Sequence, residues 1–433
     1  MRVQEQPQLL PRLLAGLSTP GRVDLDAHLD QHGELPTLVR YRGRSWASSA
    51  LDEIERAGLL GRGGAAFPTA VKMRAVAGRR RAPVVVANGC EGEPTSRKDR
   101  LLLERLPHLV LDGAAVAAAA IGARVVFVCI DHGAVRARTA LEHAVRERRQ
   151  YADRSMSVRI VGVPGGYVCS QESALVQFLN GGPAKPTIVP VYERGVAGRP
   201  TLVDNVETLA HIALIARHGA EWFRGLGSPA HPGSTLLTVG GAVLRPGVYE
   251  LDPAMTVAEL VDAAGGVREA VDAVLIGGYA GAWLKAPQSR SLHLSHEPLA
   301  AAGASLGPGL LYLLDSDTCG IAEIASVARW MSDQTAQQCG PCVNGLAAIA
   351  QQLEAIVAGR ADRDAARRIE RWCTLVPRRG ACAHPDGTTR FVSTGLHTFE
   401  HELADHIAHG PCELCLGPRR LPVPRPQPVA VAA

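Results

Sequence analysis

The spacing of hydrophobic and polar residues predicts alternating strands and helices in the first half of the chain. Short apolar runs rich in β-branched residues predict buried strands at 84–87, 125–130 and 158–163. Apolar residues at helical spacing predict helices at 100–120 and 135–148. Such alternation is typical of a mostly parallel sheet with helices on its faces. We therefore expect an α/β domain over residues 46–230, after an N-terminal extension over residues 1–45.

The pattern changes near Ser234. Two short predicted strands, 236–239 and 245–251, flank a turn at Gly240 and Gly241. A predicted helix at 256–264 follows and ends at two glycines, which suit a helix C-cap. This order fits a small ubiquitin-like β-grasp domain over residues 231–318.

Beyond Cys319 the apolar spacing becomes helical throughout. It predicts helices at 324–334, 346–358, 362–374 and 391–409. We expect a four-helix bundle over residues 319–416. The tail, 417–433, is rich in proline and arginine and is predicted to be extended or disordered.

Composition narrows the partners and the compartment. A net charge of +4, with arginines scattered among acids, argues against nucleic acid as a ligand. The longest apolar stretch, 109–128, is interrupted by Asp112, Gly122 and Arg124, so no segment predicts a membrane span. The first residues do not have the pattern of a secretory signal, which predicts a cytoplasmic protein with reduced thiols. Ten cysteines then predict metal or redox chemistry for some of them.

Residues 61–72 read G-R-G-G-A-A-F-P-T-A-V-K. Three glycines in four positions allow unusual backbone angles and leave room for a ring or a phosphate. A tight turn between two helices explains the same glycines, and the segment is not a G-x-G-x-x-G fingerprint.

Three further polar segments follow predicted strands or open predicted helices. They are N-G-C-E-G-E at 88–93, G-G-Y-V-C-S-Q-E-S-A-L at 165–175 and R-P-T-L-V-D-N-V-E-T-L at 199–209. The ends of parallel strands are where α/β sheets place ligands. Asn88 suits a flavin edge, and Glu91 and Glu93 suit ribose hydroxyls or a carboxamide. Ordinary acid-rich, capped helix starts explain all three segments as well.

The cysteines include the motif C-G-P-C at 339–342, with Cys382 some forty residues on. Such a loop between helices predicts a metal or iron–sulfur site. A redox dithiol is less favoured because the surroundings are not a thioredoxin-like βαβ unit. Cys412 and Cys415 form a second C-x-x-C, either a ligand pair or incidental thiols.

Together these five segments resemble, in their order, the NADH-oxidising flavoprotein subunit of respiratory complex I. This family also includes subunits of some bidirectional hydrogenases and formate dehydrogenases. The resemblance runs from about residue 49 to about residue 408. It implies a Rossmann-like FMN-binding domain, an SLBB-type β-grasp domain and a C-terminal four-helix iron–sulfur bundle. It also implies NADH as substrate, with FMN and a [4Fe–4S] cluster as cofactors.

The resemblance also implies roles for individual residues. Glu93 and Glu172 match family positions at the catalytic centre. Phe67 would offer its ring to the nucleotide base, Lys72 would approach the flavin, and Tyr192 lies near a family phenylalanine that stacks on NADH. The full set of implied cofactor-binding residues is Gly61, Arg62, Gly63, Gly64, Phe67, Lys72, Asn88, Glu91, Tyr167, Tyr192, Asn205 and Thr208. Cys339, Cys342 and Cys382 match three of the four cluster cysteines.

The chain departs from the family at its first cluster cysteine, which is Ala336 here. A cluster would need another ligand, be a three-iron species, or have an open iron. The candidates for another ligand are Cys319, Cys373, His384 and the pair Cys412 and Cys415.

Other departures lie at the flavin. Cys90 stands where the family has an aspartate, Ser170-Gln171 replaces Gly-Glu, and Asp204 replaces an asparagine. Two of these changes remove negative charge, which should raise the flavin potential. We expect a divergent paralogue that serves a smaller electron-transfer system.

The expected function is FMN-dependent NADH dehydrogenase chemistry, with electrons passing through the cluster to a ferredoxin, quinone-linked or membrane reductase partner. A ferredoxin or a thioredoxin-like [2Fe–2S] subunit is the expected partner, and the chain would lie at the inner face of the membrane through that partner. Two alternatives remain: a ferredoxin-fed flavoprotein that does not use NADH, and a non-catalytic structural subunit. The retained glycine loop, Glu93 and Glu172 favour the first interpretation, and the lost cysteine and carboxylates favour the others.

Overall fold

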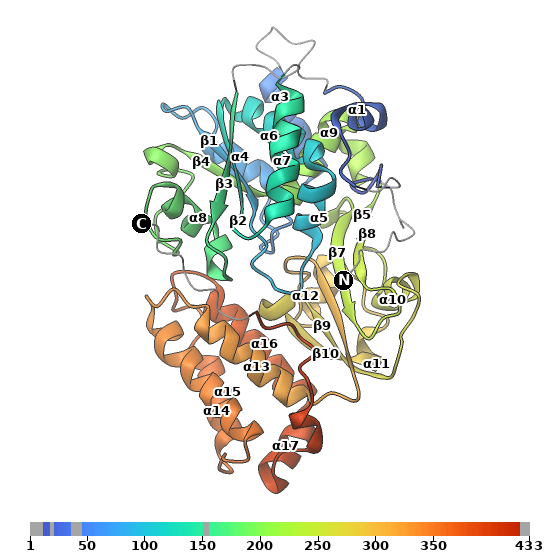
Figure 1. Cartoon of the computed structure of the whole chain (residues 1–433), viewed down its shortest axis with the longest axis vertical. Helices are drawn as coiled ribbons and strands as arrows, with labels where there is room; N and C mark the ends of the chain where they lie inside the picture. The colour runs from blue at the N-terminus through green and yellow to red at the C-terminus, as the bar shows by residue number, and fades with distance from the viewer. Residues whose placement is uncertain (1–11, 18–20, 36–45, 150–155, 425–433) are drawn as a thin grey trace.

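A computed structural model describes residues 12–17, 21–35, 46–149 and 156–424. They form an α/β part, a β-grasp part beside it and a helical part below it (Figure 1). Among these residues, no helix combines the length and the apolar character needed to cross a membrane.

The α/β part contains a parallel four-stranded sheet in the order β3-β2-β1-β4. The strands are β1 (Val84–Gly89), β2 (Val125–Asp131), β3 (Ser157–Val163) and β4 (Thr201–Asn205). The three predicted strands are confirmed, whereas β4 was not predicted. Its five residues precede a helix start, and that helix start was the only signal taken from the sequence there.

Helices cover both faces of this sheet. They are α3 (Trp46–Ala57), α4 (Thr69–Val76), α5 (Lys98–Arg105), α6 (Pro107–Ile121), α7 (Val135–Arg148), α8 (Glu172–Leu179) and α9 (Val206–Arg224). Val85 and Val126 pack into the large core with α6 and α9, and their neighbour Val86 packs on the opposite face against Leu175 of α8. The single helix predicted over 100–120 is two helices, because Pro107 cannot continue α5 and instead begins α6.

The described residues before 46 pack against the rest of the chain. They include α1 (Leu25–His32) and the buried side chain of Leu13. The backbone N–H groups of Leu13 and Leu14 donate to the Glu250 carboxylate in the β-grasp part, at 2.9 and 3.0 Å. This segment therefore bridges the α/β and β-grasp parts.

The β-grasp part has a five-stranded sheet in the order β10-β9-β11-β7-β8. Its strands are β7 (Thr235–Gly241), β8 (Gly247–Leu251), β9 (Val271–Ile276), β10 (Ala282–Lys285) and β11 (Leu310–Asp315). Only β7 and β11 run parallel; the other pairs are antiparallel. The predicted helix is α10 (Val257–Ala263), which begins with a reciprocal capping box between Thr256 and Glu259. The short elements are β5 (Gly227–Ser228), β6 (His231–Pro232), α11 (Ala286–Ser289) and α12 (His296–Ala301).

The helical part packs α13 (Gly320–Asp333), α14 (Ala347–Val357), α15 (Ala365–Leu375) and α16 (His384–Thr398) into the predicted bundle. A π-helical turn, Pro341–Leu346, leads into α14. The helix predicted over 391–409 is divided into the end of α16 and a separate helix, α17 (Glu400–His409), at the bottom of Figure 1. The division is at Phe399, which leaves helical geometry while its ring packs closely on Gly320 and Trp283.

The short 3₁₀ turns are η1 (Val168–Ser170), η2 (Val196–Gly198), η3 (Gly278–Ala280) and η5 (Glu413–Leu416). The described part of the predicted tail, 417–424, is extended and held against the bundle, with Leu421 only 1% exposed.

Candidate functional site

The carboxyl edge of the parallel sheet brings together the four polar segments of the α/β part. Asn88 at the end of β1 and Asn205 at the end of β4 are paired across the sheet. The Asn88 side-chain amide donates to the Ser170 carbonyl at 2.8 Å. A Cβ on Gly63 would lie 3.2 Å from the Asn205 Cβ, so the glycine loop approaches β4 directly. Segments separated by more than a hundred residues therefore share one edge, as a ligand site in an α/β sheet requires.

The glycine loop lies between α3 and α4, as a tight turn between helices would. Gly64 has a φ of 119°, which favours glycine. The Arg62 backbone N–H donates to the Thr208 hydroxyl at 2.9 Å, and its buried guanidinium donates to the Pro232 and Ser234 carbonyls. Burial lowers the pKa of Arg62 to about 10, so it stays charged at neutral pH. Arg62 and Thr208 thus fasten the loop to α9 and to the β-grasp part, while the backbone around Gly63 faces the sheet edge.

A cavity of about 160 Å³ lies between this loop and the β-grasp part, lined by Gly61, Gly64, Leu306 and Gly307 among others. It is smaller than the ~300–1,000 Å³ of typical ligand pockets. The cavity therefore does not by itself account for a nucleotide site.

Lys72 lies between two acids at the sheet edge. Its ammonium donates to the Glu172 carboxylate at 3.0 Å and to the Val203 carbonyl at 3.1 Å, and Asp204 lies 3.9 Å away. Burial opposes the Lys72 charge, but attraction to Asp204 and Glu172 outweighs it and raises its pKa. Burial raises the pKa of Asp204 to about 7 although Lys72 acts in the opposite direction. Lys72 and Glu172 are thus brought together, with Asp204 as a third member.

Asn205 is held by a buried charge cluster that sequence reasoning missed. Its side-chain amide donates to the Asp99 carboxylate at 2.7 Å. Lys98 forms ion pairs of 2.8 Å with both Asp99 and Glu207, and its side chain is 1% exposed. Asn205 also caps α9 by accepting the Glu207 N–H, so the predicted helix start is present, with Asn205 and not the Asp204 carboxylate as its cap. The R-K-D-R run at 97–100 was the available signal, but charged residues at a helix start usually face solvent.

Glu91 and Glu93 have different surroundings. Glu91 accepts from the Ser96 hydroxyl at 2.6 Å and from the Asp99 N–H at 3.1 Å, so it acts as an acid at the start of α5. Glu93 accepts from the Thr95 hydroxyl at 2.6 Å and from the Tyr279 N–H of η3 at 2.8 Å. Burial raises the pKa of Glu93 to about 7 despite these hydrogen bonds.

The three implied aromatic residues also differ. Phe67 and Tyr192 are 47% and 42% exposed, so both rings are open to a ligand. Tyr167 packs against the helical part: its ring meets Trp330 edge-on at 5.8 Å, and its N–H donates to the Gln334 side chain at 2.9 Å. The segment that carries Tyr167 therefore contacts both the sheet edge and the bundle.

The three implied cluster cysteines line one small hollow. Cys339, Cys342 and Cys382 face it together with Ala336, and Val168 of η1 forms part of its wall. Three thiols converging between helices fit an iron–sulfur cluster with three protein cysteines. Ala336 offers only a methyl group, so the fourth family ligand is missing from this place.

The candidate replacement ligands lie elsewhere. Cys319, Cys412 and Cys415 form a separate group with His406. Cys373 is buried in the bundle core, and the Nε2 atom of His384 is hydrogen-bonded to the Met331 carbonyl at 2.9 Å. Among the described residues, none of these side chains lines the hollow at Cys339.

Comparisons with known proteins agree with this division. The chain matches three family models: the Nuo51 FMN-binding domain over residues 54–214, the SLBB domain over 236–278, and the NADH-ubiquinone oxidoreductase-F iron-sulfur binding region over 322–406.

Relatives cover almost the full length. The second F-type component of NADH-quinone oxidoreductase from Rhizobium meliloti (strain 1021) is 31% identical over 422 residues, covering 93% of this chain and 99% of the relative. The F-type component of the same enzyme from Mycobacterium tuberculosis (strain ATCC 25618 / H37Rv) is 30% identical and covers 86% of this chain and 89% of the relative. In the crystal structure of an NAD⁺-reducing [NiFe]-hydrogenase in the H₂-reduced state, one chain superimposes with a TM-score of 0.81 at 29% identity, covering 93% of this chain and 67% of that one. The chain therefore belongs to the family of F-type components of NADH-quinone oxidoreductase, with an FMN-binding domain, an SLBB domain and a C-terminal iron–sulfur-binding region.

Proposed function

We propose that this chain oxidises NADH with bound FMN and passes the electrons through an iron–sulfur cluster to a partner protein. One observation carries the proposal: the segment from Tyr167 to Ser170 contacts both candidate sites. The Ser170 carbonyl accepts the Asn88 amide at the sheet edge, and Val168 lines the hollow of the cluster cysteines. A flavin at this edge and a cluster at this hollow would be separated by one short 3₁₀ turn, which suits electron transfer between them.

The sheet edge fits a flavin by its shape and its donors. Gly63 supplies a backbone without a side chain beside Asn205, where a Cβ would crowd the asparagine. Bound FMN would supply the hydride and single-electron chemistry that no side chain provides. Lys72 would place its positive charge beside that group, and Glu172 and Asp204 hold the ammonium in position.

NADH would approach from the exposed side. The open rings of Phe67 and Tyr192 are suited to stacking on a nucleotide base. Glu93 would accept hydrogen bonds from the substrate in its ionised form, which its raised pKa makes dependent on pH. Hydride transfer itself needs no general base, so the carboxylates act by binding and by orientation.

The substitutions at the flavin site bear on the flavin potential. Gln171 caps α8 by accepting the Ser173 and Ala174 N–H groups at 2.8 and 3.0 Å, so it keeps a capping role without a negative charge. Fewer negative charges near a flavin favour its reduced, more negative form. We expect a higher flavin potential than in family members with acids at these positions; a potential at or below theirs in a redox titration would contradict the charge argument.

The partner we propose is a ferredoxin or a thioredoxin-like [2Fe–2S] subunit, with onward transfer to a quinone-linked or membrane reductase. The chain would then work in the cytoplasm, at the inner face of the membrane through that partner. Pull-down of the native complex followed by mass spectrometry identifies the partner.

The test is an anaerobic absorbance titration of the reconstituted protein with NADH. We expect NADH to bleach the flavin band and then the broad iron–sulfur absorption. The Cys339→Ala variant should lose the second change and keep the first. Bleaching by dithionite but not by NADH would favour a ferredoxin-fed flavoprotein. Failure to bind FMN at all would leave a structural subunit.

A further inference from the structure

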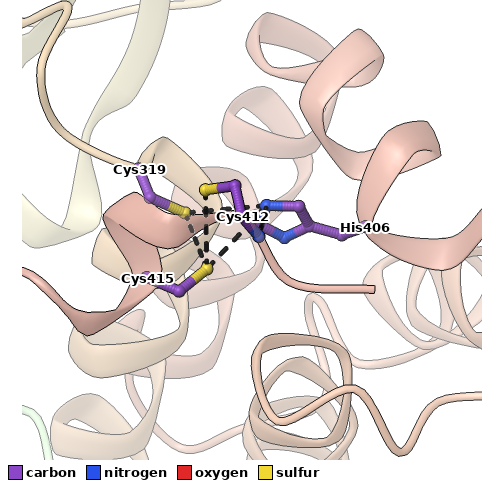
Figure 2. Close-up of side chains that lie close together, drawn as sticks. All are labelled: Cys319, His406, Cys412 and Cys415. Atoms are coloured by element: carbon purple, nitrogen blue, oxygen red, sulfur yellow. Dashed lines mark hydrogen bonds between the residues drawn. The ribbon is translucent and has the colours of Figure 1, made fainter. Parts of the chain in front are cut away.

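Four potential metal ligands converge at a place outside the flavin and cluster sites (Figure 2). Cys319 is the N-cap residue of α13, His406 lies on α17, and Cys412 and Cys415 flank the start and end of one turn near η5. Cys319, His406 and Cys415 are 1%, 4% and 6% exposed. Figure 2 shows the three sulfur atoms and the imidazole pointing toward one another from these separate elements.

The distances fit the edges of a tetrahedron around one ion. Zinc–sulfur distances of about 2.3 Å and zinc–nitrogen distances of about 2.0 Å give tetrahedral edges of roughly 3.8 Å between two sulfurs and roughly 3.6 Å between sulfur and nitrogen. The Sγ atom of Cys415 lies 3.4 Å from that of Cys319 and 3.8 Å from that of Cys412. The His406 Nε2 atom lies 3.8 Å from the Cys415 sulfur and 4.0 Å from the Cys319 sulfur.

The same distances argue against an iron–sulfur cluster here. A cluster binds its cysteines through separate iron ions and so spreads their sulfur atoms over more than one tetrahedral edge. All four ligand atoms of this group lie within 4.8 Å of one another. A disulfide would pair only two of the three sulfurs and would leave the third sulfur and the buried imidazole unexplained. Three thiolates and one imidazole on a single tetrahedral ion are a common structural zinc set.

We propose that Cys319, His406, Cys412 and Cys415 bind one Zn²⁺ ion in a closed, structural site. Binding releases the three thiol protons to solvent, because zinc takes the thiolate form of cysteine. The complex would carry one net negative charge, and the N-terminus of α13 compensates it: the Ala322 N–H already donates to the Cys319 sulfur at 3.3 Å. The Cys319 thiol donates to Glu402 at 2.8 Å, and after losing that proton Glu402 keeps the Gly320 and Ile321 N–H donors at 3.2 and 3.1 Å.

The site's role follows from what comes after Cys415. The Arg420 and Leu421 N–H groups each donate to the buried Glu323 carboxylate at 2.9 Å. The Tyr279 hydroxyl donates to the Pro422 carbonyl at 2.8 Å, and the Tyr279 N–H is the group that donates to Glu93. A metal at the four ligands would fasten this C-terminal segment across the bundle and against the turn that positions Glu93.

Metal analysis of three variants tests the proposal. The wild-type chain, purified with its iron, should contain one zinc per chain, and Cys412→Ser should lose most of it. Cys373→Ser is the matched control: it removes a buried cysteine of the same bundle that lies outside the group, and it should keep its zinc. Cys339→Ser should lose iron and keep zinc. Zinc absent from the wild type, or iron lost with Cys412→Ser in its place, would overturn the assignment.

Measurements on the unmutated chain guard against a variant that does not fold. Cobalt exchanged into the site should give the visible bands of tetrahedral Co²⁺ with thiolate charge transfer. Removal of zinc by a chelator should expose Cys319, Cys412 and Cys415 to alkylation and allow trypsin to cut after Arg419 or Arg420. Octahedral cobalt bands, or alkylation and cleavage unaffected by the chelator, would refute a closed zinc site.

Discussion

Replacing Lys98 with methionine tests the buried charge cluster that holds Asn205. The Lys98 side chain is 1% exposed, and those of its partners Asp99 and Glu207 are 7% and 0% exposed. Burial opposes the Lys98 charge, but the two acids outweigh it and raise its pKa. Methionine keeps most of the apolar stem and removes the charge. Breaking a buried pair by removing one partner costs about 3–5 kcal/mol, because it leaves an uncompensated buried charge.

The expected loss is large enough to measure as a melting temperature. For a domain of about 150–250 residues, each kcal/mol lowers Tm by roughly 2–4 °C, so Lys98→Met should lower Tm by roughly 6–20 °C. The control is Lys285→Met, since Lys285 pairs with Glu400 at a site where the two side chains are 34% and 48% exposed. Such exposed pairs contribute about 0–1 kcal/mol. Differential scanning calorimetry of both variants, at equal cofactor content, gives the comparison.

A Tm loss for Lys98→Met no larger than that for Lys285→Met would refute the reasoning. A second change separates charge from packing. Adding Glu207→Gln to Lys98→Met removes one of the two stranded acids and should recover part of the stability. No recovery would mean that the lost packing of the lysine stem, and not the stranded charge, causes the effect.

Three further predictions concern the two candidate sites. Because the pKa of Glu93 is raised to about 7 from 4.5, the folded chain holds this proton more tightly than the unfolded chain; Glu93 should stabilise the fold at low pH and lose that contribution as the pH rises to about 7, and Glu93→Gln should flatten this slope in Tm measured against pH. Phe67→Ala should raise KM for NADH with a stability change within about 0.5 kcal/mol, and Val71→Ala, an equally exposed change nearby, should leave KM unaltered; equal KM values in both variants would contradict a stacking role. Ala336→Cys should supply the fourth cluster ligand and increase iron per chain, as seen by iron analysis and electron paramagnetic resonance, whereas Ala348→Cys, outside the hollow, should not; unchanged iron in Ala336→Cys would mean that the hollow holds no four-iron cluster.

The sequence by itself determined the elements whose signals are local. Buried strands such as β1 are recognisable because both faces of a parallel strand are covered, which gives continuous apolar runs. The capping box that starts α10 and the glycines that end it lie within a few residues of one another. The order of the motifs sufficed for the family, because each motif is short and keeps its place between such elements.

Boundaries set by packing were not readable in this way. Pro107 divides α5 from α6 where helical periodicity alone continued, and Phe399 divides α16 from α17 because its ring packs on Gly320, far away in sequence. The strand β4 has only five residues, and its pairing with β1, not its own pattern, makes it a strand.

The sites show the same division. The sequence supplied Asn88, Lys72 and Glu172, but only the fold placed them on one edge, since the ends of parallel strands meet there whatever their separation in the chain. Arg62 matched a ligand-binding pattern, yet the tertiary structure buries its guanidinium against the backbone of the β-grasp part.

The cysteines show this division most clearly. Ten cysteines indicated metal chemistry, and the spacing of Cys339 and Cys342 indicated one site, because ligands within a turn are close in any fold. Which distant cysteine joins which pair was not contained in the spacing. The fold carries Cys382 to the first pair, and carries Cys319 and His406 to the second, because helix packing in the bundle, and not sequence distance, decides which side chains come within ligand reach.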